Sequence, residues 1–300
     1  MTMIKNKTVL VTGGSRGIGK LVGEYLLQAG AKKLIIWDID KRGLHETSRD
    51  LRNAGHRVQF YVADVSKLGD IERTAASILK SDGEIDILVH CAGIVVGKDF
   101  AEHTYAEIER SVNTNLLGVM QVTRAFLPNM IENKSGHIVT IASAAGLLPN
   151  RRMAAYVASK WGLIGWSESL RLELEKLGRN LHVTTVTPSY ISTGMFEGAK
   201  APLLTPILKP EKIARKIVKA IQSNKILVRA PFMVHFIPLL RGILPARVFD
   251  FVAGKIFGVY NSMSTYTGRQ RPLQSQQRRG PRRFHRRPRP APKSTPPSSQ

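Results

Sequence analysis

A tyrosine and a lysine four residues apart form the pair with the clearest chemical potential in this sequence. Tyr156 and Lys160, in the stretch YVASK, would share one face of a helix. The phenol of a free tyrosine, with a pKa of about 10, is a poor base at neutral pH, but a cation held beside it lowers that pKa. Such a tyrosine could exchange a proton with an alcohol or a carbonyl group. A surface tyrosine packed on a lysine stem is the alternative, although only Tyr156 of the seven tyrosines has a lysine at this spacing.

A serine ends a strand-like run shortly before this pair. Ser143 closes the apolar stretch HIVTIAS, thirteen residues ahead of Tyr156. In open α/β sheets, ligands bind outside the carboxyl ends of the strands. We therefore expect the hydroxyl of Ser143 at a ligand-binding position.

A glycine-rich loop follows the first strand-like run. The stretch TGGSRGIG lies between a predicted strand and a predicted helix, which is the context of a dinucleotide-binding loop. Glycines let the backbone approach a pyrophosphate closely, and the helix that follows offers free N–H groups and the positive end of its dipole. A plain strand-to-helix turn is the alternative. The candidate cofactor-binding residues of this loop are Gly13, Ser15, Arg16, Gly17, Ile18 and Gly19.

An aspartate at the end of the second predicted strand bears on the choice of cofactor. Asp38 lies nineteen residues beyond Gly19, where a carboxylate can accept hydrogen bonds from the adenosine ribose and repel a 2′-phosphate. This favours NAD over NADP. Arg16, Lys41 and Arg42 could meet a phosphate and keep NADP as the alternative, but we interpret Lys41 and Arg42 as the solvated start of a helix.

Asp64 follows the third predicted strand, and two roles stay open for its side chain. It could cap the next turn, or it could accept a hydrogen bond from the adenine amine. No metal site is predicted.

The elements that must position these residues alternate between strands and helices. Continuous runs of Val, Ile, Leu and Thr are typical of a parallel sheet covered on both faces. The alternation predicts an α/β fold, a Rossmann-like doubly wound parallel sheet of about seven strands with right-handed crossovers. The predicted strands are Thr8–Val11, Lys33–Trp37, Arg57–Val62, Ile85–His90, His137–Ala142, His182–Thr187 and Ile226–Arg229. The predicted helices are Ile18–Gln28, Lys41–Ala54, Lys67–Lys80, Tyr105–Glu132, Ala154–Leu177 and Glu211–Ser223.

Charge is distributed unevenly along the chain. The 300 residues carry 45 Lys and Arg against 22 Asp and Glu, a formal net charge of +23. Residues 1–197 hold 24 basic and 20 acidic residues, whereas residues 198–300 hold 21 basic and 2 acidic residues. The excess therefore describes the last third of the chain. A hydrophobic content of 43% excludes wholesale disorder, and the single cysteine, Cys91, excludes an internal disulfide and favours a reducing compartment.

Three parts are expected along the chain: a dinucleotide-binding catalytic domain over residues 1–230, an apolar and basic extension over 231–268, and a disordered Arg/Pro-rich tail over 269–300. No secretory signal and no long apolar run is visible, which favours a cytoplasmic protein that is at most peripheral to a membrane. The extension is a lid, a subunit interface or a membrane-surface segment. For the last role, a helix from Ala246 would gather Val248, Phe249, Val252, Ile256 and Val259 on one side.

Several motifs in a fixed order make the chain from about Lys5 to Arg229 resemble the short-chain dehydrogenase/reductase family. They are TGGSRGIG, the pair Asp64–Val65, the stretch HCAG, the stretch NLLG from Asn115, Ser143 and YVASK. The resemblance implies a nicotinamide-dependent oxidoreductase, with hydride transfer to or from the substrate carbon, and a homo-oligomer. It implies Tyr156 as the acid/base, Lys160 as the residue that lowers its pKa and holds the nicotinamide ribose, Ser143 as the partner of the reacting oxygen and Asn115 as the anchor of a water relay. Further cofactor contacts are implied at Asp64, Val65, Ala92, Gly93 and Pro188.

Two positions depart from the family pattern. Cys91 stands where the family usually has Asn, which removes a side-chain contact but leaves Ala92 and Gly93 intact. Ser189 stands where Gly usually follows Pro188 and could shift the fit of the substrate. Cys91 is interpreted as a small packed residue rather than a nucleophile.

The segments Leu34–Leu44 and His137–Gly146 are similar to the membrane- and lipid-droplet-associated hydroxysteroid and retinol dehydrogenases. This similarity implies an apolar alcohol or ketone as substrate, such as a steroid, a retinoid or a lipid-like molecule. The loop Ile191–Pro206 is a candidate lid. Candidate wall residues are Ala145, Leu147, Leu148, Met195 and Phe196.

An anionic membrane surface is a further candidate partner, whereas nucleic acid is expected to bind only non-specifically through the tail. The tail holds nine Arg, one Lys and no acidic residue, with little aromatic character. The alternative function is binding of a polyanion or a membrane surface as the main role, with the cofactor domain as a sensor.

Overall fold

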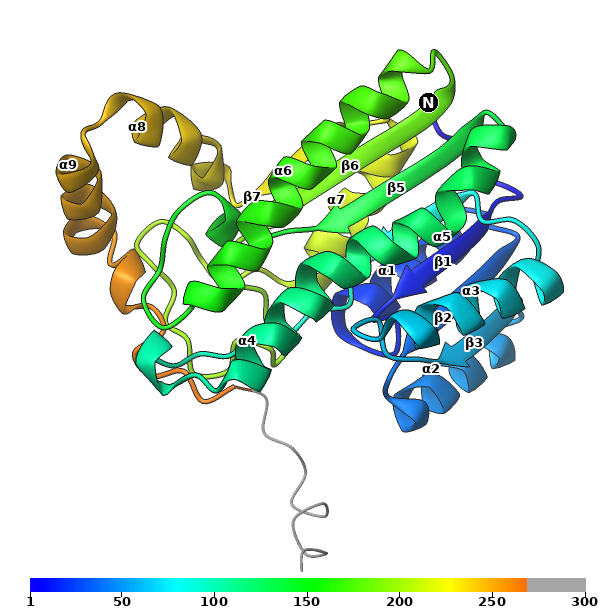
Figure 1. Cartoon of the computed structure of the whole chain (residues 1–300), viewed down its shortest axis with the longest axis horizontal. Coiled ribbons are helices and arrows are strands. Elements are labelled where there is room, and N and C mark those ends of the chain that lie inside the picture. Colours follow the sequence, from blue (N-terminus) through cyan, green and yellow to red (C-terminus); the bar gives the residue numbers. More distant parts are fainter. Residues whose placement is uncertain (269–300) are drawn as a thin grey trace, which may run out of the picture. The chain divides into compact units, whose positions relative to one another are not determined.

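Seven parallel strands form the frame of the molecule, and the computed structural model describes residues 1–268 of the chain (Figure 1). The strands lie side by side in the order β3-β2-β1-β4-β5-β6-β7. The order reverses between β1 and β4, which is where doubly wound sheets bind ligands at the carboxyl ends of their strands. The strands are β1 (Thr8–Thr12), β2 (Lys33–Asp38), β3 (Val58–Val62), β4 (Ile87–His90), β5 (Ser135–Ile141), β6 (Asn180–Pro188) and β7 (Leu227–Ala230).

Helices cover both faces of this sheet (Figure 1). Side chains from α1, α2 and α7 pack with Val9 and Val11 of β1 on one face, and side chains from α3, α5 and α6 pack with Leu10 on the other. Because both faces are covered, the central strands β1, β2 and β4 are buried at consecutive positions and not only at alternate ones. The helices are α1 (Gly17–Gln28), α2 (Lys41–Asn53), α3 (Leu68–Ser81), α4 (Tyr105–Val112), α5 (Gly118–Glu132), α6 (Ala154–Lys176), α7 (Pro210–Gln222), α8 (Ile237–Ile243) and α9 (Ala246–Phe251).

The predicted fold class is confirmed, and each predicted strand agrees with the structure to within two residues at either end. The segment predicted as one helix over 105–132 differs, because a π-helical turn at Asn113–Leu117 separates α4 from α5. Such turns insert an extra residue into a helix and often occur at functional sites.

The extension over 231–268 is folded into short helices and turns. A helix begins at Ala246 as expected, but α9 ends at Phe251, a π-helical turn continues it only to Ile256, and Gly258 adopts a left-handed conformation with φ of 70°. Phe249 is buried, whereas Val248 and Ile256 are exposed, so the expected apolar stripe is divided between two environments. The physical reason is that part of the segment packs on the body of the protein instead of presenting one face to a surface.

Among residues 1–268, no helix combines the length and the apolarity needed to cross a bilayer. The tail predicted over 269–300 lies outside the described residues.

Candidate active site

The glycine-rich loop packs closely against the backbone that follows β4. Gly13 has a φ of 68°, and a Cβ atom there would lie 2.5 Å from the nitrogen of Ala92. A Cβ on Gly19 would lie 2.2 Å from the carbonyl oxygen of Gly13. Arg16 precedes α1 without any capping hydrogen bond from its side chain. The first N–H groups of α1 are therefore available to an anion, and the loop fits a dinucleotide pyrophosphate. Ile18 packs against the core and fixes this helix to the sheet.

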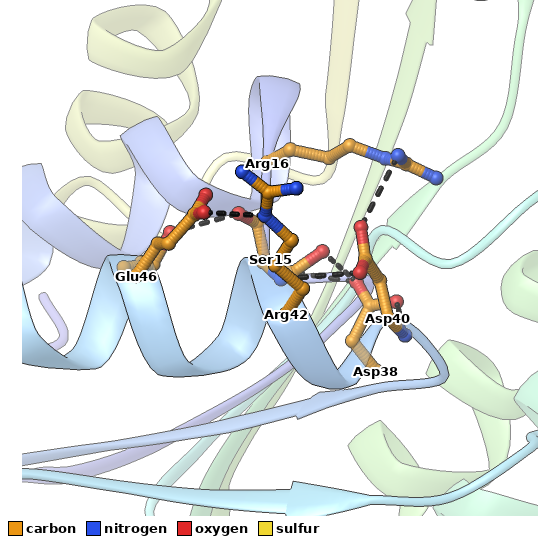
Figure 2. A network of polar contacts seen from close by, with 8 residues as sticks. Ser15, Arg16, Asp38, Asp40, Arg42 and Glu46 are labelled. Carbon is orange, nitrogen blue, oxygen red and sulfur yellow. Dashed lines mark hydrogen bonds and ion pairs between the residues drawn. The ribbon is translucent and has the colours of Figure 1, made fainter. Parts of the chain in front are cut away.

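The carboxylate of Asp38 is held by the loop (Figure 2). Its Oδ2 accepts hydrogen bonds from the backbone nitrogen and the hydroxyl of Ser15, at 3.1 and 2.7 Å, and its Oδ1 accepts one from the nitrogen of Asp40 at 3.0 Å. Ser15 is itself buried and accepts a hydrogen bond from Thr47 at its carbonyl oxygen. A carboxylate can accept about four hydrogen bonds, so Asp38 keeps acceptor capacity for a ribose hydroxyl.

The two arginines near Asp38 are paired with carboxylates (Figure 2). Arg16 lies 3.3 Å from Asp40 Oδ2, and Arg42 lies 2.8 Å from Glu46 Oε1. The contact with Glu46 raises the pKa of the Arg42 guanidinium above its usual value. Both arginines are exposed, so the pairs are weak and screened by salt. The interpretation of Arg42 as part of a solvated helix start agrees with this geometry.

The other residues expected to contact the cofactor lie at or just beyond the carboxyl ends of β3, β4 and β6. Asp64 Oδ1 accepts hydrogen bonds from the nitrogen and the hydroxyl of Ser66, at 2.9 and 2.7 Å, so its side chain caps the turn before α3. The contact with adenine stays a prediction. Val65 is buried against Gly118, and Pro188 ends β6. At Gly93 an added Cβ would lie 3.3 Å from Asn115 Oδ1 and 3.9 Å from Lys160 Nζ.

Tyr156 and Lys160 lie in α6 and are both buried. Lys160 Nζ is 5.7 Å from the centre of the Tyr156 ring and donates a hydrogen bond of 2.8 Å to the carbonyl oxygen of Ile141, at the end of β5. Ser143 follows two residues later, and its hydroxyl lies close to the phenol of Tyr156. The structure therefore gathers the hydroxyl, the phenol and the ammonium group at one strand end.

The expected effect of Lys160 on Tyr156 is not found in this structure. Burial raises the pKa of Tyr156, the nearby hydroxyl of Ser143 offsets part of this rise, and Lys160 does not contribute to the shift. Burial also lowers the pKa of Lys160 to about 8. The physical reason is that both groups lose their hydration in the same apolar surroundings, which disfavours the charged form of each.

Asn115 lies in the π-helical turn and connects this turn to the segment after β4. Its Oδ1 accepts a hydrogen bond of 2.9 Å from the nitrogen of Ile94, and its Nδ2 donates one of 2.9 Å to the oxygen of the same residue. Nδ2 also contacts Ser159 Oγ at 3.1 Å, and Ser159 donates to the carbonyl of Tyr156. Asn115 thus links the region of Gly93 to the helix that carries Tyr156.

A cavity opens beside Ser143. Its lining is mostly apolar and includes Ala145, Leu148 and Phe196 of the expected wall. Leu147 and Met195 do not line it, and Leu147 packs instead against a cluster around Leu163. The extension supplies much of the remaining wall, through Met233, Val234, Ile237, Leu240, Phe249, Val252, Ala253, Phe257 and Val259.

The end of the extension forms backbone hydrogen bonds with the loop Ile191–Pro206, which is the candidate lid. Lys200 N donates to Ser262 O at 2.8 Å, Leu203 N donates to Phe257 O at 2.9 Å, and Thr267 N donates to Glu197 O at 3.0 Å. Met263 is fully buried in the cluster that contains Tyr156. The sequence analysis missed this role of Met263, since no local pattern connects the extension with α6.

The two departures from the family pattern have different surroundings. Burial raises the pKa of the Cys91 thiol to about 12, so the thiol stays protonated and is a poor nucleophile. Ser189 lines the cavity, and its buried hydroxyl has no partner among the described residues.

Comparisons with known proteins agree with this geometry. The family model described as short chain dehydrogenase matches residues 7–203. Epidermal retinol dehydrogenase 2 of Mus musculus is 36% identical over 272 residues, which cover 89% of this chain and 87% of the relative. Estradiol 17-beta-dehydrogenase 11 of Macaca fascicularis is 33% identical over 254 residues, which cover 84% of each chain.

Two solved structures are similar as well. A metagenomic short-chain oxidoreductase in complex with NADP superimposes with a TM-score of 0.65 at 30% identity, over 77% of this chain and 100% of the other. A short chain dehydrogenase/reductase from Burkholderia phymatum in complex with NAD has a TM-score of 0.72 at 23% identity, over 91% of this chain and 99% of the other. The second likeness concerns the fold alone.

Proposed function

This chain belongs to the short-chain dehydrogenase/reductase family, and from that premise we propose that it transfers a hydride between a nicotinamide cofactor and an apolar alcohol or ketone. As a member of this family it is an oxidoreductase of CH–OH groups that uses NAD or NADP. The observation that carries the finer proposal is the position of Ser143, which lies close to Tyr156 and also lines the apolar cavity.

Each side chain of the site has a distinct task in this proposal. Ser143 hydrogen-bonds the reacting oxygen, and Tyr156 gives the proton to that oxygen or takes it away. Lys160 holds a positive charge beside the phenol. Asn115 connects α6, through Ser159, to the segment after β4 that contains Gly93. A bound nicotinamide supplies or accepts the hydride at its ring.

The substrate class follows from the cavity wall and from the relatives. The extension encloses the cavity with aliphatic and aromatic side chains, which favours a steroid, a retinoid or a lipid-like alcohol. The relatives named for retinol and estradiol support the same class.

An anionic membrane surface is the partner that we propose for the extension. Phe232, Ile243 and Phe251 are 72%, 70% and 58% exposed, and the exposed Arg247 and Lys255 lie in the same segment. Exposed apolar side chains with neighbouring cations favour the interface of an anionic bilayer, where each cation contributes about 1 kcal/mol.

We expect the full chain to reduce NAD in the presence of hydroxysteroids, retinols or long-chain alcohols, and to be slow with short hydrophilic alcohols. The measurement is the absorbance of the reduced nicotinamide in a substrate screen, run with and without vesicles that contain anionic lipid. Vesicles should raise the rate for apolar substrates if the extension binds them. Equal rates for apolar and hydrophilic alcohols would contradict the proposed substrate class, and unchanged rates with vesicles together with no sedimentation on them would contradict the membrane partner.

NAD is the preferred cofactor in this proposal, and Asp38→Ala is expected to weaken the preference. Loss of a hydrogen bond to a charged group corresponds to about a tenfold to hundredfold change in the ratio of kcat/KM for NAD and NADP. Glu132→Ala is the control, since Glu132 is an exposed carboxylate at the end of α5, away from the carboxyl ends of the strands. A wild-type enzyme with equal or higher kcat/KM for NADP would refute the preference.

A further inference from the structure

The described part of the chain ends in a segment that packs against the cluster around Tyr156. Residues 262–268, which we call the strap, follow the short helices of the extension and form the orange end of the ribbon in Figure 1. Met263 is fully buried in one apolar cluster with Tyr156 and Met153, and Tyr266 packs against that cluster. The strap thus supplies part of the cover that leaves Tyr156 only 4% exposed.

The strap also contacts the segment that follows β4. A Cβ atom on Gly97 would collide with the ring of Tyr266 and would lie 3.0 Å from Cε of Met263. At the loop Ile191–Pro206, the nitrogen of Thr267 donates a hydrogen bond of 3.0 Å to the oxygen of Glu197. The strap therefore connects the candidate lid to the segment after β4.

Arg152 fastens the strap to the loop that precedes α6. Its Nη1 donates hydrogen bonds to the carbonyl oxygens of Met263 and Ser264, at 3.1 and 3.0 Å. Because the guanidinium is charged, these bonds are stronger than bonds between neutral groups. Arg152 has a φ of 59°, a backbone conformation that favours glycine. The contacts of its side chain with the strap are therefore what an arginine contributes at this position.

The cover separates Tyr156 from the cavity. Ser143 and Phe196 line the cavity, whereas Tyr156 is not among the described residues that line it. To exchange a proton with the phenol, the substrate oxygen must come within about 3 Å of it. Part of the cover must therefore move before a substrate in the cavity can react. Phe196 belongs to the loop that the strap holds through Glu197, so the strap and this loop have to move together.

We propose that the strap covers the reacting end of the site, where Ser143, Tyr156 and Lys160 meet, and that Arg152 is a positioning residue that sets how often this cover opens to the substrate. Arg152 acts through the strap and not by contact with the reacting atoms. A substrate that binds only the open form has an apparent affinity reduced by the fraction of open molecules. This proposal rests on the proposed function, because it takes Tyr156 as the group that exchanges the proton.

Opening of the strap also changes the ionisation of Tyr156. Burial is the main reason that the pKa of Tyr156 is raised, and Tyr190 and Tyr266 raise it further, whereas Ser143 lowers it. Lys160, on the same helix, lies 5.7 Å from the centre of the ring. When the strap moves away, water reaches the phenol and Tyr266 leaves it, so the pKa falls toward its ordinary value. Because oxidation of an alcohol needs the phenolate as base, kcat/KM should then rise at a lower pH.

The experiment measures kcat/KM of the full-length enzyme for an apolar alcohol with NAD across the neutral and alkaline range. Arg152→Met keeps an unbranched side chain but removes both hydrogen bonds to the strap. We expect kcat/KM to increase by about tenfold, the fold-change that one hydrogen bond corresponds to, and the midpoint of its pH profile to move to lower pH. Hydrogen exchange at the amide of Thr267, measured by mass spectrometry, should become faster.

Two further variants separate the strap from general effects on the loop. Gly97→Ala displaces the ring of Tyr266 without altering Arg152, so it should change kcat/KM and the pH midpoint in the same direction. Arg151→Met is the matched control, since Arg151 is exposed and faces the ring of Tyr260 at 6.0 Å. It should keep the wild-type values. A loop that is merely destabilised would lose activity without a shift of the midpoint.

Three results would overturn the proposal: exchange at Thr267 that is unchanged in Arg152→Met, faster exchange with an unchanged kcat/KM and midpoint, or a kcat/KM that falls. If no alcohol reduces the nicotinamide, the proposed function fails, but the role of the strap can still be decided. The ultraviolet titration of Tyr156, obtained as the difference from Tyr156→Phe, is then compared with and without Arg152→Met. A lower pKa of Tyr156 in the Arg152→Met background supports the proposal, and an equal pKa overturns it.

Discussion

Tyr156→Phe is expected to lower kcat for every alcohol by about a hundredfold to ten-thousandfold, the usual contribution of a positioned acid/base group. The substitution removes only the phenolic oxygen, which Ser143 contacts at the reacting end of the cavity. The ring keeps its packing, since Phe196 lies edge-on at 6.0 Å from the ring centre. Fold and cofactor binding should therefore survive, and the loss should appear in kcat in steady-state assays.

Tyr190→Phe is the matched control for this result. Tyr190 lines the cavity beside Ser143 and packs against Phe196 at 5.1 Å, but Ser262 and Asn150 contact its hydroxyl. Its loss of kcat should stay below about tenfold, since the acid/base group remains in place. A Tyr156→Phe enzyme that retains wild-type kcat, with cofactor affinity confirmed by fluorescence titration, would show that another group moves the proton.

Lys160→Met is expected to abolish activity and to change the pH dependence of stability. Lys160 is 5% exposed, and the pKa of its ammonium group falls from 10.5 to about 8 because burial disfavours the charge. Folding with a protonated Lys160 below pH 8 thus costs free energy that a methionine does not cost. The variant also loses the hydrogen bond to Ile141. The change in the free energy of unfolding at pH 7 therefore combines a gain from the removed charge with a loss from the missing hydrogen bond.

The pH dependence isolates the effect of the charge. Between pH 8 and pH 10.5 the unfolded chain keeps the proton of Lys160 while the folded chain releases it, so the stability of the wild type rises with pH relative to the variant. A pKa lowered to about 8 corresponds to a relative gain of about 2 kcal/mol between pH 7 and pH 9.5. Urea unfolding at both pH values measures it. Lys176→Met, at an exposed position of the same helix, should give a difference from wild type that does not vary with pH. A constant difference for Lys160→Met would contradict the lowered pKa.

Local patterns in the sequence determined the sheet, its covering helices and the residue types at the reacting end. The strands could be predicted from the sequence because buried parallel strands form continuous apolar runs. The positions of Gly13, Ser143 and Tyr156 followed from spacing, since a strand end and a helix face fix neighbours a few residues apart. These features depend on short-range geometry, which the sequence carries directly.

Only the tertiary structure decided what surrounds these residues. The contact between Asn150 and Ser262 spans 112 positions, and no local pattern records such a pairing. The extension was predicted from its composition, but its packing over the cavity depends on many distant contacts. The direction of the pKa shift of Tyr156 also escaped the sequence analysis, because it depends on how completely other segments remove water from the phenol. Spacing thus determined which groups meet at the strand end, and burial by remote segments decided the pKa shifts of those groups and the apolar lining of the cavity.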